Sequence, residues 1–85
     1  MTEVEIGKVT HYYDHLHVAV LNLREPIHVG ETVHVIGHST ELVQKVESLQ
    51  IDHNPVEQAG PGADVALLVG EMVHEHDRIY RIGEA

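Results

Sequence analysis

The sequence predicts an all-β protein: a small closed barrel of six short, mainly antiparallel strands that forms a single domain over residues 1–85. Three observations favour this fold class. Apolar residues alternate with polar ones at period two, turn-forming residues separate these stretches at short intervals, and only one stretch fits a helix equally well. Closure into a barrel would also remove the unpaired edges that an open sheet leaves exposed.

Three strands are expected in the first half of the chain, at residues 4–9, 16–21 and 32–36. Alternation places every second side chain on the buried face of a sheet. In the third strand, Val33 and Val35 should therefore point inward and His34 toward solvent. The first two strands are separated by a turn at residues 11–15, and the second carries apolar residues at both parities, which indicates partial cover on both faces.

Two residues, Pro26 and Gly30, are expected to shape the turn before the third strand. Pro26 interrupts backbone pairing because proline donates no hydrogen bond. Gly30 is available for the positive φ that a tight turn requires. A second turn at residues 37–40 then follows this strand.

Residues 41–52 fit two secondary structures. A helix would gather the following side chains on one face: Leu42, Val43, Val46, Leu49 and Gln50. As a strand, Val46 has the opposite parity to Leu49 and Ile51, so all three point inward only if a β-bulge adds one residue near positions 47–48. Periodicity alone leaves the two alternatives open.

The second half of the chain is expected to add two more strands, at residues 64–69 and 78–82. Pro55 ends the preceding segment because a residue before proline is driven toward extended conformations. Residues 56–62 then form a long turn rich in glycine and proline. A polar loop at residues 71–77 separates the last two strands.

The composition limits what this chain can be. Hydrophobic residues make up 42% of it, with no phenylalanine or tryptophan, so a core must be built from branched aliphatic side chains. There are no cysteines, which excludes disulfides, zinc–thiolate sites and thiol catalysis. The apolar runs are far shorter than the roughly 20 residues of a membrane span. We expect a cytoplasmic protein that does not contact the membrane.

The charge balance argues against nucleic acid as the main partner. Fourteen acidic residues against five basic ones give a formal net charge of −9 with neutral histidines. Binding to a phosphate backbone draws most of its sequence-independent strength from Lys and Arg. A basic footprint should therefore be visible if RNA were bound directly, and the sequence does not display one.

Two segments resemble a known family. Residues 29–33, Val-Gly-Glu-Thr-Val, resemble its "hydrophobic, Gly, Asp or Glu, x, hydrophobic" turn. Residues 55–65 resemble its loop of "hydrophobic, x, x, Ala, x, x, Gly, Asp or Asn, x, Val". The chain is thus similar to domain 2 of translational GTPases such as elongation factor Tu, a small closed β-barrel, and is expected to be a stand-alone version of it. A similar barrel occurs as the C-terminal module of collagenase-type peptidases, and the chain resembles only that accessory part.

The resemblance, which covers residues 6–82, implies architecture more than chemistry. Gly30 and Gly62 would turn the chain where a side chain clashes, and Ala59 is small enough to sit under the loop. The phosphate-binding spacing of GTPases is missing around Gly7, so no GTP is expected. In elongation factor Tu, an arginine of the first strand lies near the aminoacyl end of tRNA, and Ile6 stands at the equivalent position here.

Histidine is unusually frequent, at nine residues in 85. Two His-x-His pairs stand out, His15 with His17 and His74 with His76. On a strand, residues two apart share a face, so each pair could present two imidazoles to a zinc, nickel or copper ion. Spacing fixes no third ligand, so we assign no metal or cofactor site. A pH-sensing role is a further alternative, because histidine changes charge near neutral pH.

Few residues are suited to catalysis. Ser39 and Ser48 are the only serines, and neither lies in a Gly-x-Ser-x-Gly elbow. Acid pairs such as Glu25 with Glu31, or Asp52 with Glu57, would lack a deep cleft to desolvate them. We therefore expect no enzymatic activity and no catalytic residues.

Tyr12 and Tyr13 are the best candidates for a binding contact. At least one of these adjacent rings should be exposed in the first turn, beside Lys8, where it could stack on a base or pack against a protein. The other interpretation is that one ring caps the end of the barrel.

Three functions follow from these observations. The first is a non-enzymatic binding or adaptor module that docks on a protein or ribonucleoprotein partner. The second is a metal-binding or metal-sensing protein that uses the His-x-His pairs. The third is a detached accessory module of a peptidase-like enzyme.

Overall fold

The computed structural model describes residues 2–83, which form ten strands and no helix. The strands are β1 (Thr2–Tyr13), β2 (Val18–Leu23), β3 (Ile27–His28), β4 (Thr32–Ile36), β5 (Glu41–Lys45), β6 (Leu49–Ile51), β7 (Asn54–Val56), β8 (Gln58–Ala59), β9 (Asp64–Leu68) and β10 (Arg78–Gly83). Across residues 2–83 there is accordingly no helix able to cross a membrane. The all-β prediction is confirmed.

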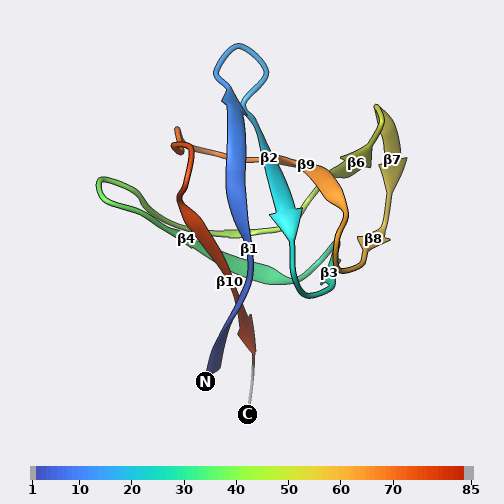
Figure 1. Cartoon of the computed structure of the whole chain (residues 1–85), viewed down its shortest axis with the longest axis horizontal. Coiled ribbons are helices and arrows are strands. Elements are labelled where there is room, and N and C mark those ends of the chain that lie inside the picture. The colour runs from blue at the N-terminus through green and yellow to red at the C-terminus, as the bar shows by residue number, and fades with distance from the viewer. Residues whose placement is uncertain (1, 84–85) are drawn as a thin grey trace.

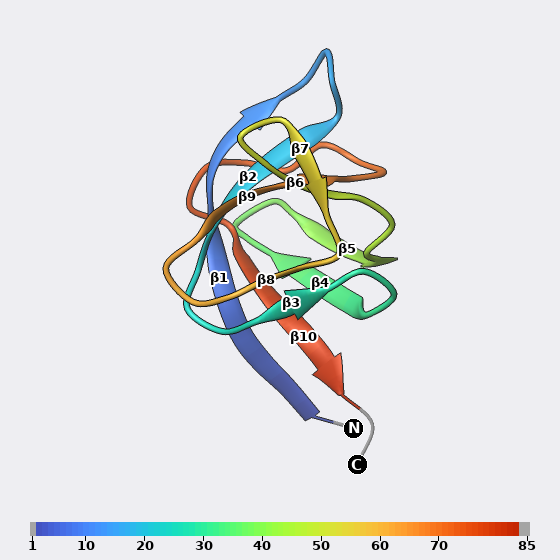
Figure 2. The same ribbon diagram turned by 90° about the vertical axis from the view of Figure 1, so that its right-hand side faces the viewer.

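Eight strands form one antiparallel sheet in the order β5-β4-β10-β1-β2-β9-β6-β7. β3 and β8 pair separately, and Figure 2 shows them running side by side. The long central strand β1 joins the two halves of the sheet, with β10 on one side and β2 on the other. β4 and β5 run crosswise to β1 and β2 (Figure 1), so the sheet is strongly curled around its buried face.

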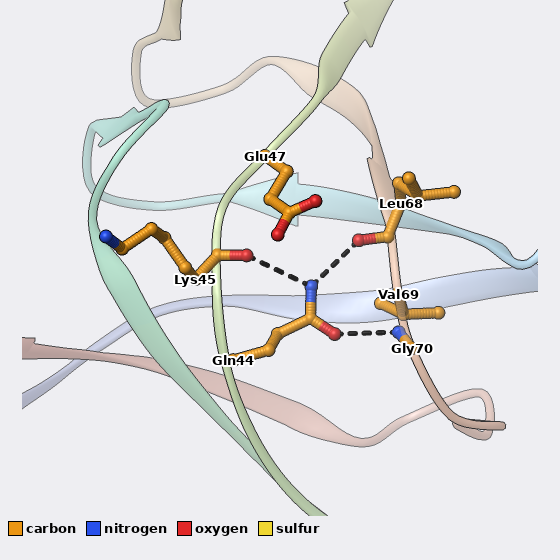
Figure 3. Close-up of a pocket in the computed structure, with 6 residues that line it drawn as sticks. All are labelled: Gln44, Lys45, Glu47, Leu68, Val69 and Gly70. Carbon is orange, nitrogen blue, oxygen red and sulfur yellow. Dashed lines mark hydrogen bonds between the residues drawn. The ribbon is translucent and has the colours of Figure 1, made fainter.

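The closed six-stranded barrel predicted from the sequence is not formed by backbone pairing in residues 2–83. The sheet has two edges, β5 and β7, and no backbone ladder joins β5 to β9 across the gap. A side chain spans this gap instead: the Gln44 carboxamide binds the backbone of Leu68 and Gly70 (Figure 3). The strand count also exceeds six, because the pairings of β3, β7 and β8 involve two or three residues each, too few to produce a periodic signal.

The first hairpin is longer than predicted. Tyr12 and Tyr13 pair with Ala19 and Val18, so β1 continues through the segment that was expected to turn. The turn itself occupies residues 14–17. The strands expected at 32–36, 64–69 and 78–82 correspond closely to β4, β9 and β10.

Residues 41–52 form two strands rather than a helix, β5 and β6, separated by a break at residues 46–48. The break does what the predicted bulge was expected to do, because Val46 and Leu49 are both buried and Ile51 is half-buried. Val46 leaves the ladder to pair elsewhere: its N–H donates to Glu31 O at 2.7 Å, and its carbonyl accepts from Gly30 N at 2.8 Å.

A tight hairpin joins β6 to β7, in a segment that was expected only to end a strand. Asp52 and His53 have φ values of 51° and 66°. Positive φ at both central residues is the signature of the two-residue turns that match the twist of paired strands. The turn places Pro55 opposite Gln50 in the ladder.

The core consists of aliphatic side chains, as the composition predicts. The largest fully buried side chains are Ile6, Val9, Leu21, Leu23, Ile27, Val33, Val35, Val46, Leu49, Val65, Leu67 and Ile79. They come from most strands of the sheet, so burial couples both halves of the chain. Apolar burial of roughly 25 cal/mol per Å² is therefore the main stabilising term.

His34 does not face solvent as expected. Its side chain is only 13% exposed, and its Nδ1 atom lies 3.1 Å from Glu3 Oε1. Its Nε2 atom is buried and lies 3.4 Å from Glu41 Oε2, in a geometry that does not make a hydrogen bond. The curl of the sheet brings the carboxylates of Glu3 on β1 and Glu41 on β5 over β4. Alternation along a strand predicts only whether a side chain points inward or outward, so it could not predict this cover.

The glycines of the two family-like segments adopt the predicted positive φ, 99° at Gly30 and 86° at Gly62. The expected clash is absent, because a Cβ added at either position meets no atom within 4 Å. Backbone conformation alone therefore requires glycine there. Ala59 is 8% exposed and belongs to the core, as predicted for a residue under this loop.

Candidate functional site

A group of exposed and half-buried apolar side chains lies on the outer surface of β1, β2 and β9. Val18 and Val20 alternate with buried Ala19 and Leu21, so they point away from the core. In the ladder Tyr13 lies opposite Val18, and Ala66 lies opposite Val20. Leu16, in the connecting turn, is 64% exposed. We call Tyr13, Leu16, Val18, Val20 and Ala66 the apolar face.

The apolar face borders an open hollow of about 440 Å³. The hollow also has polar walls, contributed by Gln50, Asp52, His53 and Asp64. Contiguous exposed apolar surface with a polar border is typical of interaction sites on small soluble domains. An apolar centre with a polar rim is also the usual anatomy of a protein–protein interface.

Of the two adjacent tyrosines, one packs on the core and the other is exposed as a candidate binding contact. Tyr12 packs against the core, whereas Tyr13 is 47% exposed. The Tyr13 ring packs against the His11 ring at a tilted angle of 54°, with a centroid distance of 4.4 Å. Lys8 is not beside Tyr13: it is five residues away along β1, roughly 16 Å at strand rise, and borders a different hollow.

The His-x-His pairs do not lie on strands. His15 and His17 are in the turn at residues 14–17, and His74 and His76 are in the segment between β9 and β10. His17 and His76 have positive φ values of 55° and 75°, so the alternation that would align each pair is lost. Within residues 2–83, no group of three or more His, Cys, Asp or Glu side chains is arranged so that it could hold a metal ion.

A threonine, a histidine and an aspartate meet near the turn at 74–77, but not as a catalytic triad. Thr40 Oγ1 lies 2.9 Å and Asp77 Oδ2 lies 3.9 Å from the same atom, His74 Nδ1. A catalytic base instead uses its two ring nitrogens, one toward the nucleophile and one toward the acid. Thr40 is also only 7% exposed, so its hydroxyl is not presented to a substrate. This cluster pins two turns together.

Neither serine side chain makes a hydrogen bond to a histidine within residues 2–83. Ser39 is exposed in the turn at 37–40, and Ser48 is half-buried between β5 and β6. In the acidic pair of Glu25 and Glu31, Glu31 has structural partners of its own. Glu31 accepts a hydrogen bond from His28 N at 2.6 Å and forms an ion pair with Arg81, which gives it a structural partner other than Glu25.

No protein-family profile matches the chain. Curated proteins do match it, among them the following two. The chain is 36% identical over 83 residues to an uncharacterized protease of Methanocaldococcus jannaschii, covering 96% of this chain and 20% of that protein. It is 30% identical over 81 residues to a collagenase of Porphyromonas gingivalis, covering 93% of this chain and 20% of that protein. The chain thus spans about one fifth of the length of these relatives.

The fold is shared with a solved peptidase domain. The C-terminal domain of a putative U32 peptidase from Geobacillus thermoleovorans superimposes with a TM-score of 0.87 and 18% sequence identity, over 93% of this chain and 92% of that one. A selenomethionine variant of the same domain gives a TM-score of 0.85. This chain therefore has the fold of a peptidase C-terminal domain. Its sequence relatives are of the protease and collagenase type.

These similarities favour one of the two resemblances inferred from the sequence. The similarity to a C-terminal module of collagenase-type peptidases is supported by both sequence and fold. The similarity to domain 2 of elongation factor Tu is supported neither by these relatives nor by the shared peptidase-domain fold. The apolar face was not singled out from the sequence, although the apolar residues at both parities of 18–21 were its signal.

Proposed function

We propose that this chain is a non-enzymatic accessory domain that packs against the catalytic region of a peptidase-type protein. The observation that carries this proposal is the coverage of the sequence match. Almost the whole chain, 96% of it, corresponds to only 20% of the Methanocaldococcus protease. The chemistry of such a protein would then be carried by the other four fifths, and this domain would support or position it.

The apolar face supplies the contact surface for this role. Tyr13 and Leu16 are 47% and 64% exposed. Covering them would remove apolar surface from water, which favours association, and tyrosine is enriched at the energetically dominant positions of interfaces. The Thr40–His74–Asp77 geometry, which lacks the arrangement of a triad, agrees with a domain that has no catalysis of its own.

The other two functions have less support. A translation-type adaptor rests on the resemblance of two fold-determining segments alone. Metal binding required each His-x-His pair to share a face of a strand, and the structure places both pairs in turns.

Cysteine labelling in a chimera tests the proposal. This chain would replace the matched fifth of the Methanocaldococcus protease, and the chain alone would serve as the reference. Because the chain has no cysteine of its own, Leu16→Cys places one thiol on the apolar face. Val43→Cys is the matched control, since Val43 is 56% exposed and lies on β5, away from that face.

We expect Leu16→Cys to react with maleimide about tenfold more slowly in the chimera than in the free chain, because burial limits access of the reagent to the thiolate. Val43→Cys should react at the same rate in both, as followed by mass spectrometry of the peptide that carries it. Equal rates at position 16 would contradict docking through this face. Hydrolysis of gelatin by the purified 85-residue chain would contradict the non-enzymatic role.

A further inference from the structure

Three of the five basic residues of this acidic chain converge on one hollow. We call it the cationic hollow, an open depression of about 430 Å³ on the outer side of β1 and its neighbours. The residues that line it are Glu5, Gly7, Lys8, Thr10, Asn22, Arg24 and Arg78. Such a concentration of positive charge is unexpected on a chain whose formal net charge is −9.

One carboxylate organises the two arginines. Glu5 Oε2 accepts from Arg24 Nη1 at 3.2 Å, and Glu5 Oε1 accepts from Arg78 Nη1 at 3.2 Å. The Glu5 side chain is 23% exposed, whereas the two arginines are 67% and 61% exposed. A guanidinium has five N–H donors. These contacts occupy one nitrogen of each arginine, which leaves other N–H donors of both available for a second acceptor.

The backbone holds Arg24 in place independently of its side chain. The pairing of β1 shifts register between Glu5 and Gly7, which leaves Ile6 out of the ladder. The freed Ile6 carbonyl accepts from Arg24 N at 2.8 Å and from Glu25 N at 3.2 Å. A bulge of this kind re-aims neighbouring side chains, and here it ties the end of β2 to β1 beside Glu5.

Gly7 makes this close approach possible. A Cβ at this position would lie 2.6 Å from Asn22 O and 3.3 Å from Leu23 Cα. Both are backbone atoms of β2, so they have little freedom to move aside. Glycine at this position therefore lets β1 and β2 approach closely at one wall of the hollow, which Lys8 and the two arginines also line.

We propose that the cationic hollow binds a single carboxylate, the side chain of an aspartate or glutamate on a protein partner. Arginine forks suit carboxylates and phosphates alike, so charge decides between them. Glu5 offsets one of the three positive charges, and Asp64, which accepts from Asn22 at 3.0 Å, borders the site. The small surplus that remains matches one negative charge, whereas the net charge of −9 repels a polyanion such as RNA.

A titration followed by ¹⁵N–¹H NMR tests this inference on the free chain, so it does not depend on the accessory role proposed above. The probe is the capped peptide Ac-Ala-Glu-Ala-NH₂, at constant ionic strength. Saturable shifts are expected at the amides of Gly7, Lys8 and Arg24, with none at residues 41–45. The matched peptide with glutamine in place of glutamate should produce no saturable shift.

Variants locate the site. Arg24→Gln and Arg78→Gln should each weaken peptide binding about tenfold, because each removes a charge-assisted hydrogen bond. Lys45→Gln makes the same change in charge outside the hollow and should leave binding unchanged. The same spectra show whether each variant is folded. We expect both variants to fold, since both arginines are mostly exposed.

Three results would overturn the inference. They are equal shifts with the glutamine peptide, no saturation with the glutamate peptide, and tighter binding of inorganic phosphate or hexauridylate than of the glutamate peptide at the same residues. The last result would assign the hollow to phosphate-bearing ligands instead of a protein carboxylate.

Discussion

Gln44 Oε1 accepts a hydrogen bond from Gly70 N at 2.8 Å. The same carboxamide donates from Nε2 to Leu68 O, also at 2.8 Å (Figure 3). Its two ends thus bind backbone groups as a peptide unit of a neighbouring strand would. This side chain connects the edge strand β5 to the end of β9, at the place where the sheet has no ladder.

We expect Gln44→Ala to lower the free energy of unfolding by about 1–2 kcal/mol, because the two hydrogen bonds that reach Leu68 and Gly70 are lost. Urea denaturation measures the change. Gln50→Ala is the matched control, since Gln50 is exposed on β6 and its side chain makes no hydrogen bond within residues 2–83. Its expected effect is below about 0.5 kcal/mol. Equal losses in the two variants would show that the Gln44 bridge contributes nothing to stability.

Gly37 should tolerate a side chain poorly. A Cβ at Gly37 would overlap the carboxylate of Asp77, which is 5% exposed and accepts from His74 N at 2.8 Å. We expect Gly37→Ala to cost about 2–3 kcal/mol through overpacking, measured by thermal or urea unfolding. At Gly70, the corresponding Cβ meets only Gln44 Oε1, at 3.8 Å. If Gly70→Ala proved as damaging as Gly37→Ala, overlap with Asp77 would not be the cause.

The strand positions could be predicted from the sequence because one face of each strand is buried. Val33 and Val35 are 0% and 1% exposed, in agreement with the period-two pattern of β4. The positive φ values of Gly30 and Gly62 were likewise predictable, since they depend on local backbone geometry. Local signals thus identified the main strands and two of the turns.

The open sheet and the surface sites depend on contacts that the sequence does not encode locally. Gln44 and Gly70 are 26 residues apart, and Glu5 and Arg78 are 73 apart. No periodicity predicts that such side chains meet. The strand geometry assumed for the His-x-His pairs is wrong for a related reason: both segments form turns, where His17 and His76 have positive φ.

The neighbouring tyrosines should differ in their effect on folding. Tyr12 packs against the core, so Tyr12→Ala is expected to cost about 2 kcal/mol. Tyr13 is 47% exposed, and Tyr13→Ala should change stability by less than about 0.5 kcal/mol. Each variant is the control for the other in urea denaturation. A larger stability loss for Tyr13→Ala than for Tyr12→Ala would mean that Tyr13, not Tyr12, packs in the core, and Tyr13 would then not belong to the apolar face.

We expect no zinc binding at micromolar concentrations by the purified chain. A stable site needs three or four convergent ligands, and no three such side chains in residues 2–83 are arranged to hold a metal ion. Isothermal titration calorimetry measures the affinity. The control replaces His15, His17, His74 and His76 with alanine, and should give the same weak or absent heat as the natural chain. Micromolar binding that is lost in this variant would reinstate the metal-binding hypothesis.

The charge of the chain should depend steeply on pH. With neutral histidines it is −9, and protonation of all nine would cancel it. Lowering the pH therefore moves the charge upward toward zero, and solubility at low salt should reach a minimum near the sequence pI of 5.3, where self-repulsion vanishes. The variant with alanine at positions 15, 17, 74 and 76 has five histidines instead of nine, so its sequence pI, and with it the solubility minimum, should be lower. A solubility profile from about pH 4 to 8 measures both chains. An unshifted minimum in the variant would mean that these four histidines do not contribute to the charge balance that keeps the chain in solution.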